Sequence, residues 1–260
     1  MSSFKIIKGS CVEQNVDAIV NAANGNMMHG GGVARAILMT CGPELNTACR
    51  KYKLPIRDGS VIVTPSFNMK NAKIVIHAVG PNFAKTPESF GELCDAYYNS
   101  LVELKNNKYH SIAFPLISSG IFAGNIENPV SVSTKYCIEA YNRFLIDNLD
   151  YENIKFYNEY NYGSYLLFKG IPVFIDSRAD LYAPEFNTET GDKKDGKDIF
   201  SDALNIAGLG THYEKKFEEY GISHIIAYEN AKLSMLLEKD SNYKLLYQDS
   251  RFKIFERKNA

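Results

Sequence analysis

The sequence predicts an α/β fold in which helices cover both faces of a mostly parallel sheet. Short apolar runs rich in β-branched residues alternate with helical patterns, which is typical of sheets whose crossovers are helices. Two of the expected strands run directly into glycine-rich loops. The length of 260 residues and a hydrophobic content of 45% suit two domains, each with its own core.

The pattern places the elements of the first half as follows. Strands are expected at residues 4–8, 18–20, 60–64, 73–79 and 111–115, and helices at residues 32–41, 44–53 and 130–148. Thr86, Pro87 and Glu88 have the order of a helix start. The helix that follows places on one face Phe90, Leu93, Cys94, Tyr97, Leu101 and Leu104.

The stretch DAIVNAANGNMMHGGGVARAI, at residues 17–37, contains the most informative pattern. An apolar strand ends at Asn21 and Asn24, three glycines follow, and a helical pattern then begins. Glycines let backbone N–H groups approach a phosphate, and the helix dipole favours negative charge. The chain has neither the G-x-x-x-x-G-K-[ST] motif nor a G-x-G-x-x-G motif after this strand. The pattern predicts a phosphate-containing ligand without identifying it.

A second glycine loop, FPLISSGIFAG at residues 114–124, follows another expected strand. Together, in this order, the two loops resemble those of the macrodomains, which bind ADP-ribose. The resemblance implies a macrodomain-like three-layer α/β/α sandwich over residues 1–157. Residues 158–260 are then expected to form a second, smaller α/β unit of unknown function.

The resemblance also implies roles for individual residues. Asn24 would position the distal ribose, with His29 and Phe122 completing the catalytic group. The glycine loops would hold the two phosphates, and Tyr157, or alternatively Phe156, would lie against adenine. The expected ligand-binding residues are Ser10, Cys11, Ala23, Asn24, Gly30, Gly31, Gly32, Val33, Ser118, Ser119, Gly120, Ile121, Phe122 and Tyr157.

Two positions depart from the family pattern. Ser10 stands where macrodomains usually carry an aspartate that accepts a hydrogen bond from adenine, and a neutral acceptor binds more weakly. Ala34 stands where several hydrolytic members carry an aspartate. The segment HGGGVA instead resembles the coronaviral macrodomains, so the hydrolase interpretation survives.

Three functions remain open on these residues. The first is hydrolysis of ADP-ribose esters, either on acidic side chains of modified proteins or in O-acetyl-ADP-ribose. The second is binding of ADP-ribose or an ADP-ribosylated protein without turnover, with the second domain as the output. The third is a scaffold with a decayed pocket, which the intact Asn24 and both glycine loops argue against.

Composition excludes other classes of partner. A net charge of −1 gives no electrostatic reason to expect nucleic acid or anionic membrane. No apolar run is long enough for a bilayer span or a signal peptide, so a cytoplasmic protein is expected. A bacterial protein is expected as a separate prediction. Five cysteines without CxxC spacing predict free buried thiols. No metal and no cofactor beyond the ligand are expected, and His77 is expected to be a hydrogen-bonded core residue.

The remainder of the chain resembles the C-terminal soluble region of bacterial polytopic glycosyltransferase-like membrane proteins, on the segments SYLLFKG and PVFIDSRADLY. Strands are expected at residues 154–157, 173–176 and 224–228, helices at 213–220 and 231–237, and a hairpin at 243–257. The strand at 154–157 is expected to serve both halves, which would then share one sheet. Asp176, Arg178 and Asp180 are expected to form an ion-paired corner, and residues 189–198 a charged loop.

Overall fold

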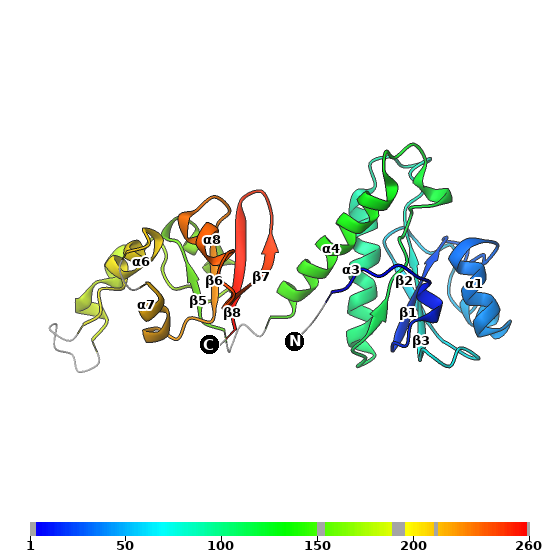
Figure 1. Ribbon diagram of the computed structural model, residues 1–260, viewed down its shortest axis with the longest axis horizontal. Helices are drawn as coiled ribbons and strands as arrows, with labels where there is room; N and C mark the ends of the chain where they lie inside the picture. The colour runs from blue at the N-terminus through cyan, green and yellow to red at the C-terminus, as the bar shows by residue number, and fades with distance from the viewer. Residues whose placement is uncertain (1–3, 150–153, 189–195, 211–212, 259–260) are drawn as a thin grey trace. The chain divides into compact units, whose positions relative to one another are not determined.

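The computed structural model describes residues 4–149, 154–188, 196–210 and 213–258 (Figure 1). The chain divides into two compact units, residues 1–144 and 145–260. Each unit contains a sheet of its own. We therefore describe the two units separately.

The first unit is built on a four-stranded sheet in the order β2-β3-β1-β4. β1 pairs in parallel with β3 and with β4, and β2 pairs antiparallel with β3, so the sheet is mostly parallel. Its strands are β1 (Ala18–Ala23), β2 (Val61–Pro65), β3 (Ile74–Val79) and β4 (Ile112–Ala113). The helices are α1 (Gly32–Cys41), α2 (Glu44–Cys49), α3 (Phe90–Asn106) and α4 (Pro129–Asp147), most of which belongs to this unit.

Alternating side chains of β1 and β3 form the cores of this unit. Ile19 and Val75 face one side of the sheet and pack in one cluster with residues of α1 and α2, among them Ile37 and Leu45. Val20 faces the other side, in a cluster that includes residues of α3 and α4. Successive strand residues point to opposite faces, so two central strands that are buried along nearly their whole length require a helical layer on each side. The expected three-layer architecture is confirmed.

Four sequence predictions in this unit were wrong in detail. The helix expected at 44–53 ends at Cys49. Residues 4–8 form no strand and are exposed, because neither edge of the sheet pairs with them. The third helix begins at Phe90 rather than at 86–88, since Thr86 bonds the carbonyl of Asn82 in a turn. The strand expected at 111–115 is only Ile112–Ala113. The expected buried face of α3 is confirmed for Leu93, Cys94, Tyr97, Leu101 and Leu104.

The second unit contains a mixed sheet in the order β5-β6-β8-β7. β5 pairs in parallel with β6, while β6 and β7 each pair antiparallel with β8. The strands are β5 (Phe156–Asn158), β6 (His224–Tyr228), β7 (Tyr243–Gln248) and β8 (Phe252–Arg257). The helices are α5 (Gly163–Phe168), α6 (Ile199–Ala207), α7 (Tyr213–Glu219) and α8 (Lys232–Leu237). The expected strand at 224–228 and the hairpin are confirmed.

The strand expected at 154–157 belongs to the second unit, which corrects two expectations. β5 lies beside β6 and not in the first sheet, so the two halves do not share a sheet. The division between compact units falls at 144/145, ahead of the expected boundary at 157/158. Residues 173–176 form no strand, because the side chain of Asn158 bonds their backbone. Most of the charged loop expected at 189–198 lies outside the described residues.

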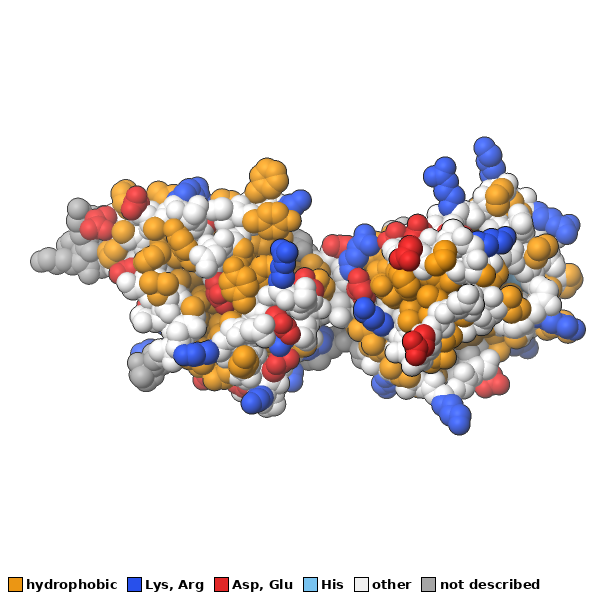
Figure 2. Space-filling model, turned by 90° about the horizontal axis from the view of Figure 1, so that it is seen from above, with side chains coloured by type: hydrophobic (Ala, Val, Ile, Leu, Met, Phe, Trp, Pro, Cys, Tyr) orange, Lys and Arg blue, Asp and Glu red, His pale blue; other side chains and the backbone are white. Residues whose placement is uncertain are grey.

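The surface carries both signs of charge. In the space-filling view, Lys and Arg side chains are interspersed with Asp and Glu side chains on the visible face of each unit (Figure 2). None of the helices in the described part of the chain combines the length and the hydropathy needed to cross a bilayer. All five cysteines are free, and four of them are buried as the sequence predicted, whereas Cys11 is only partly buried.

Candidate functional site

Both glycine loops leave the same edge of the first sheet. The first loop follows β1, and the second follows β4, which pairs in parallel with β1. The second loop also contacts the end of β3 on the other side of β1, where the hydroxyl of Ser118 donates to the carbonyl of Pro81 at 2.8 Å. Parallel strands present their carboxyl ends at one edge, which is where ligands bind in such sheets.

Asn24 closes the first turn of the first loop with its own side chain. Its Nδ2 donates to the carbonyl of Met28 at 2.8 Å, and its Oδ1 accepts from the backbone N–H groups of Asn26 and Met28 at 3.1 and 3.2 Å. Asn24 is half-buried, and Nδ2 carries a second hydrogen. The side chain therefore shapes the loop and retains one donor for a ligand.

The three glycines of the first loop are exposed and border open space. A Cβ atom added at Gly30, Gly31 or Gly32 would meet no heavy atom within 4 Å. Gly32 has a φ of +56°, a left-handed conformation that favours glycine. No side chain caps α1, whose N-cap is Gly31. The first N–H groups of the helix, including that of Val33, are therefore accessible to an anion.

His29 lies beneath this loop rather than on its surface. Its side chain is buried, and its Nδ1 is 2.9 Å from Oδ1 of Asn46. Because that oxygen accepts, Nδ1 carries the hydrogen and Nε2 keeps its lone pair. Burial lowers the pKa of His29, which the hydrogen bond to Asn46 partly offsets.

His77 belongs to the same buried polar cluster, as a core residue of β3. Its Nδ1 lies 3.0 Å from Nδ2 of Asn21, and its Nε2 lies 3.0 Å from the hydroxyl of Thr64. The sulfur of Cys49 lies 3.7 Å from the same Nε2. Burial, followed by the charge of His29, lowers the pKa of His77 to about 3. His29, Cys49 and His77 are also the described residues whose ligand atoms could surround a metal ion.

The second loop presents backbone and two apolar side chains, Leu116 and Ile121, to solvent. Gly120 borders open space, and Ile121 is 93% exposed. Phe122 is half-buried, and its carbonyl accepts from the backbone N–H of Phe83 at 2.9 Å. The hydroxyl of Ser119 donates to the carbonyl of Leu116 at 2.8 Å, so it supports the turn itself.

Tyr97 anchors the start of the second loop, a role that the sequence did not reveal. Its hydroxyl accepts from the backbone N–H of Ile117 at 2.8 Å and contacts the hydroxyl of Ser133 at 2.6 Å. Ser133 in turn donates to the carbonyl of Ile117 at 2.7 Å. The helical pattern predicts that Tyr97 is buried, but a buried hydroxyl needs a partner that only the fold supplies.

Two further glycines allow the second loop to approach its neighbours closely. A Cβ at Gly80 would lie 2.3 Å from atoms of Ile117 and Ser118. A Cβ at Gly124, which has a φ of +56°, would lie 2.5 Å from the backbone nitrogen of Ala84. Both positions therefore require glycine for the loop to reach the ends of the strands.

The remaining predicted site residues separate into two groups. Ala23 ends β1, next to Asn24, while Ser10 and Cys11 lie at the short 3-10 helix Cys11–Glu13, which packs against β1 and α1. Tyr157 is not brought to the site: it is fully buried in the core of the second unit, and its hydroxyl donates to the carbonyl of Ala203. The alternative residue, Phe156, is buried in β5 as well, so neither expectation holds.

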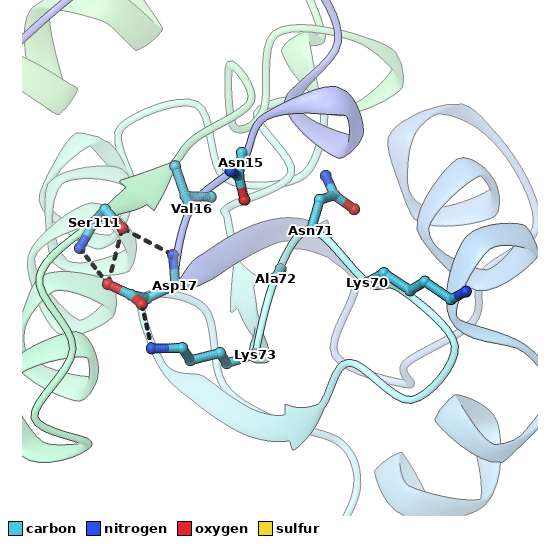
Figure 3. Close-up of a pocket in the computed structure, with 8 residues that line it drawn as sticks. All are labelled: Asn15, Val16, Asp17, Lys70, Asn71, Ala72, Lys73 and Ser111. Atoms are coloured by element: carbon cyan, nitrogen blue, oxygen red, sulfur yellow. Dashed lines mark hydrogen bonds and ion pairs between the residues drawn. The ribbon is translucent and has the colours of Figure 1, made fainter.

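A shallow pocket at the opposite edge of the sheet is not a good candidate site (Figure 3). The carboxylate of Asp17 accepts from the backbone N–H groups of His110 and Ser111, both at 3.0 Å, and pairs with Lys73 at 2.7 Å. The hydrogen bonds to Asp17 hold its pKa well below its usual range, and the one from Lys73 has the largest effect. These partners tie together the starts of three strands, so the charges are already satisfied.

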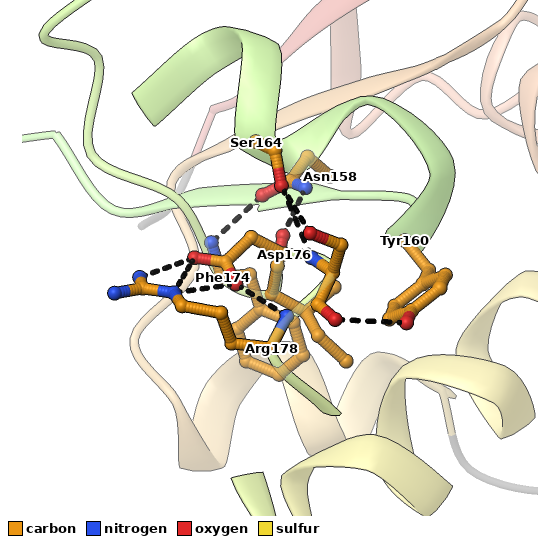
Figure 4. A network of polar contacts seen from close by, with 8 residues as sticks. Asn158, Tyr160, Ser164, Phe174, Asp176 and Arg178 are labelled. Carbon is orange, nitrogen blue, oxygen red and sulfur yellow. Dashed lines mark hydrogen bonds and ion pairs between the residues drawn. The ribbon is translucent and has the colours of Figure 1, made fainter. Parts of the chain in front are cut away.

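In the second unit, a polar network closes the carboxyl end of β5 (Figure 4). The carboxylate of Asp176 is fully buried and paired with Arg178, whose hydrogen bonds lower the pKa of Asp176 to about 2. Asn158 accepts from the backbone N–H of Phe174 and donates to the carbonyl of Ile175, both at 2.7 Å. The expected ion-paired corner is confirmed for Asp176 and Arg178.

The profile of the family described as "Macro domain" matches residues 20–132, which include both glycine loops. The O-acetyl-ADP-ribose deacetylase of Salmonella typhimurium is 41% identical over 125 residues, which are 46% of this chain and 69% of that protein. The O-acetyl-ADP-ribose deacetylase of Escherichia fergusonii is 35% identical over 167 residues, 60% of this chain and 94% of that protein. The comparisons give no support to the expected resemblance of the remainder to membrane glycosyltransferases.

A solved structure of a mutant macrodomain from Oceanobacillus iheyensis is also similar. It is 27% identical with a TM-score of 0.50, and the match covers 65% of this chain and 76% of that one. Through its first unit, this chain belongs to the macro domain family.

Proposed function

We propose that this chain binds ADP-ribose at the two glycine loops and hydrolyses an ADP-ribose ester. The observation that carries the proposal is the pair of open loops at the carboxyl ends of β1 and β4. Relatives that cover this region are named O-acetyl-ADP-ribose deacetylase, which supports the same ligand and reaction class. The substrate is O-acetyl-ADP-ribose or a protein with ADP-ribose on an acidic side chain.

The exposed backbone would supply the phosphate contacts. The N–H groups from Gly30 to Val33 bind one phosphate at the helix terminus, and those from Ser118 to Phe122 bind the other. The ester then lies near Asn24, whose remaining Nδ2 hydrogen donates to the distal ribose. Holding a phosphate-bound water against the ester would supply the rate enhancement by positioning. His29 acts from below, as a support of the loop.

Binding without turnover is the second candidate. The side chain of Asn24 already forms three hydrogen bonds within its own loop. In addition, Ser10 and Ala34 stand where the family pattern has two aspartates. A reader of ADP-ribosylated protein needs the phosphate loops but no reactive water. The two candidates therefore share the ligand and differ in catalysis.

Calorimetric titration with ADP-ribose, followed by a deacetylation assay, tests both candidates. Gly31→Glu places a carboxylate in the open space of the first loop, and the backbone there is extended, so the variant should fold. We expect the wild type to bind and Gly31→Glu to lose binding, with Gly91→Ala, on an open helix position, as the control. Acetate release that Asn24→Ala abolishes supports hydrolysis. Binding without release supports the reader, and no heat from folded wild-type protein contradicts both.

A further inference from the structure

A buried cluster beneath the first glycine loop combines three side chains that bind metals. His29 comes from the loop, Cys49 from the end of α2 and His77 from β3. One ligand atom from each residue lies within 4.8 Å of the others, and all three residues are buried. Residues far apart in sequence are thus brought together by the fold at one point.

The hydrogen bond of His29 leaves one of its ring nitrogens available to a metal ion. Its Nδ1 hydrogen is donated to Asn46, which fixes the ring and leaves the lone pair of Nε2 unused. That Nε2 is one of two buried side-chain atoms without a hydrogen-bond partner among the described residues. An unpaired buried nitrogen is costly, and a bound cation would satisfy it.

Cys49 and His77 complete a matching set of donors. The sulfur lies 3.7 Å from Nε2 of His77, close to the separation of two ligands around one small cation. Two imidazoles and one thiolate form a donor set that binds zinc in preference to magnesium or calcium.

We propose that His29, Cys49 and His77 bind a single zinc-class divalent cation beneath the first glycine loop. The fourth position of a tetrahedral site would be filled by water. This inference concerns a metal site and does not depend on the ligand or reaction proposed above.

Binding requires two proton movements. The thiol of Cys49, whose pKa burial raises to about 11, releases its proton to solvent as the sulfur bonds the cation. His77 moves its hydrogen from Nε2 to Nδ1, so that Nε2 can bond the cation. The second unpaired atom, Oδ1 of Asn21, becomes the acceptor for Nδ1 when that amide turns over. The net change is one proton released for each cation bound.

The cation would connect the first loop to two elements of the core. At present, hydrogen bonds among the described residues join the ring of His29 only to Asn46. Coordination adds links to α2 and β3, which restrict the loop from below. The site is therefore expected to stabilise the loop rather than to contact its ligand.

Cobalt titration of the reduced full chain tests the proposal, because a cobalt–thiolate bond gives a charge-transfer absorption band. The wild type should show this band at one equivalent of cobalt, and added zinc should remove it. Cys49→Ser and His29→Gln should lose the band while retaining the wild-type circular dichroism. Cys94→Ser, which changes another buried thiol of the same unit, is the matched control and should keep it.

Asn46→Ala gives an independent readout of the arrangement. Removing the partner that orients His29 should weaken zinc binding about 10–100-fold, measured by competition with a chromophoric chelator. A folded wild type without the band, or a band that persists in Cys49→Ser, would overturn the proposal. Unchanged zinc affinity in Asn46→Ala would contradict the role assigned to His29. If the metal site is overturned, the cluster is a structural one, with its unpaired atoms satisfied by buried water.

Discussion

Each unit has a parallel strand whose carboxyl end meets a polar segment, but only the first unit leaves that end open. After β1, the exposed glycines of the first loop border empty space. After β5, Asn158 bonds the backbone of Phe174 and Ile175, and Asp176 is paired with Arg178. Similar residue types thus make an accessible site in one unit and a closed corner in the other.

The space around two glycines shows the same difference between the open and the closed strand end. A Cβ at Gly30 would meet nothing, whereas a Cβ at Gly163 would lie 1.9 Å from the carbonyl oxygen of Ile175. The first glycine keeps room for a ligand, and the second lets two backbone segments of the protein touch. A glycine-rich segment therefore indicates close approach without revealing whether a ligand or the chain itself approaches.

The largest expected effect is a loss of stability when a methyl group is added at Gly163 in the second unit. Gly163→Ala should lower the free energy of unfolding of that unit by at least about 4 kcal/mol, because the methyl group overlaps backbone. Urea denaturation followed by circular dichroism measures the loss. Gly208→Ala is the control, since its Cβ would come no closer than 3.3 Å to any atom. Equal stability of the two variants would show that the corner yields without cost.

The second-largest effect is expected on acidification, which should destabilise the two units over different pH ranges. The pKa of His77 is lowered to about 3 by burial, so the unfolded state binds the proton first as pH falls from about 6.5. The free energy of unfolding of the first unit should fall between about pH 6.5 and 3, by up to about 1.4 kcal/mol per pH unit. His29 adds to this loss, while the described part of the second unit has one such residue, His224.

The second unit is expected to lose stability at a lower pH, because one of its buried titrating groups is a carboxylate. The pKa of Asp176 is lowered to about 2, so its stabilisation is complete above 3.8 and is lost as pH falls through 2. Hydrogen exchange read by mass spectrometry follows each unit separately. We expect β1 and β3 to lose protection at higher pH than β6 and β8. The reverse order would contradict the assignment of neutral, buried histidines to the first unit.

A smaller effect is expected at the anchor of the second loop. Tyr97→Phe leaves the buried N–H of Ile117 without its acceptor, which should cost about 2 kcal/mol of unfolding free energy. Tyr52→Phe is the matched control, because that hydroxyl donates to the carbonyl of Val63 on a partly exposed side chain. Thermal denaturation compares the two. Similar losses would show that the hydroxyl of Tyr97 is not a special anchor.

The smallest effect on stability is expected where the site is open. Gly30→Ala should change the free energy of unfolding by less than about 1 kcal/mol, since its Cβ meets nothing. The same methyl group should lower the affinity for ADP-ribose about tenfold, because it occupies the space proposed for a phosphate. Calorimetry and denaturation on one preparation separate the two quantities. Unchanged affinity would place the phosphate elsewhere.

Local patterns were enough to predict much of the fold and the candidate loops. The runs that became β1, β3 and β6 are apolar and β-branched, and the two glycine loops follow strands, so periodicity and motif indicated them. The face of α3 was predicted for the same reason. The sequence by itself therefore determined the family, the layers of the first unit and the positions of both loops.

The tertiary structure alone decided which distant residues meet. Periodicity indicated a strand near Tyr157, but only strand pairing showed that β5 joins the second sheet and buries this tyrosine. The convergence of His29, Cys49 and His77 likewise depends on where α2 and β3 lie relative to the first loop. Local conformation follows from neighbouring residues, whereas these contacts depend on how separate elements pack, which one-dimensional patterns do not contain.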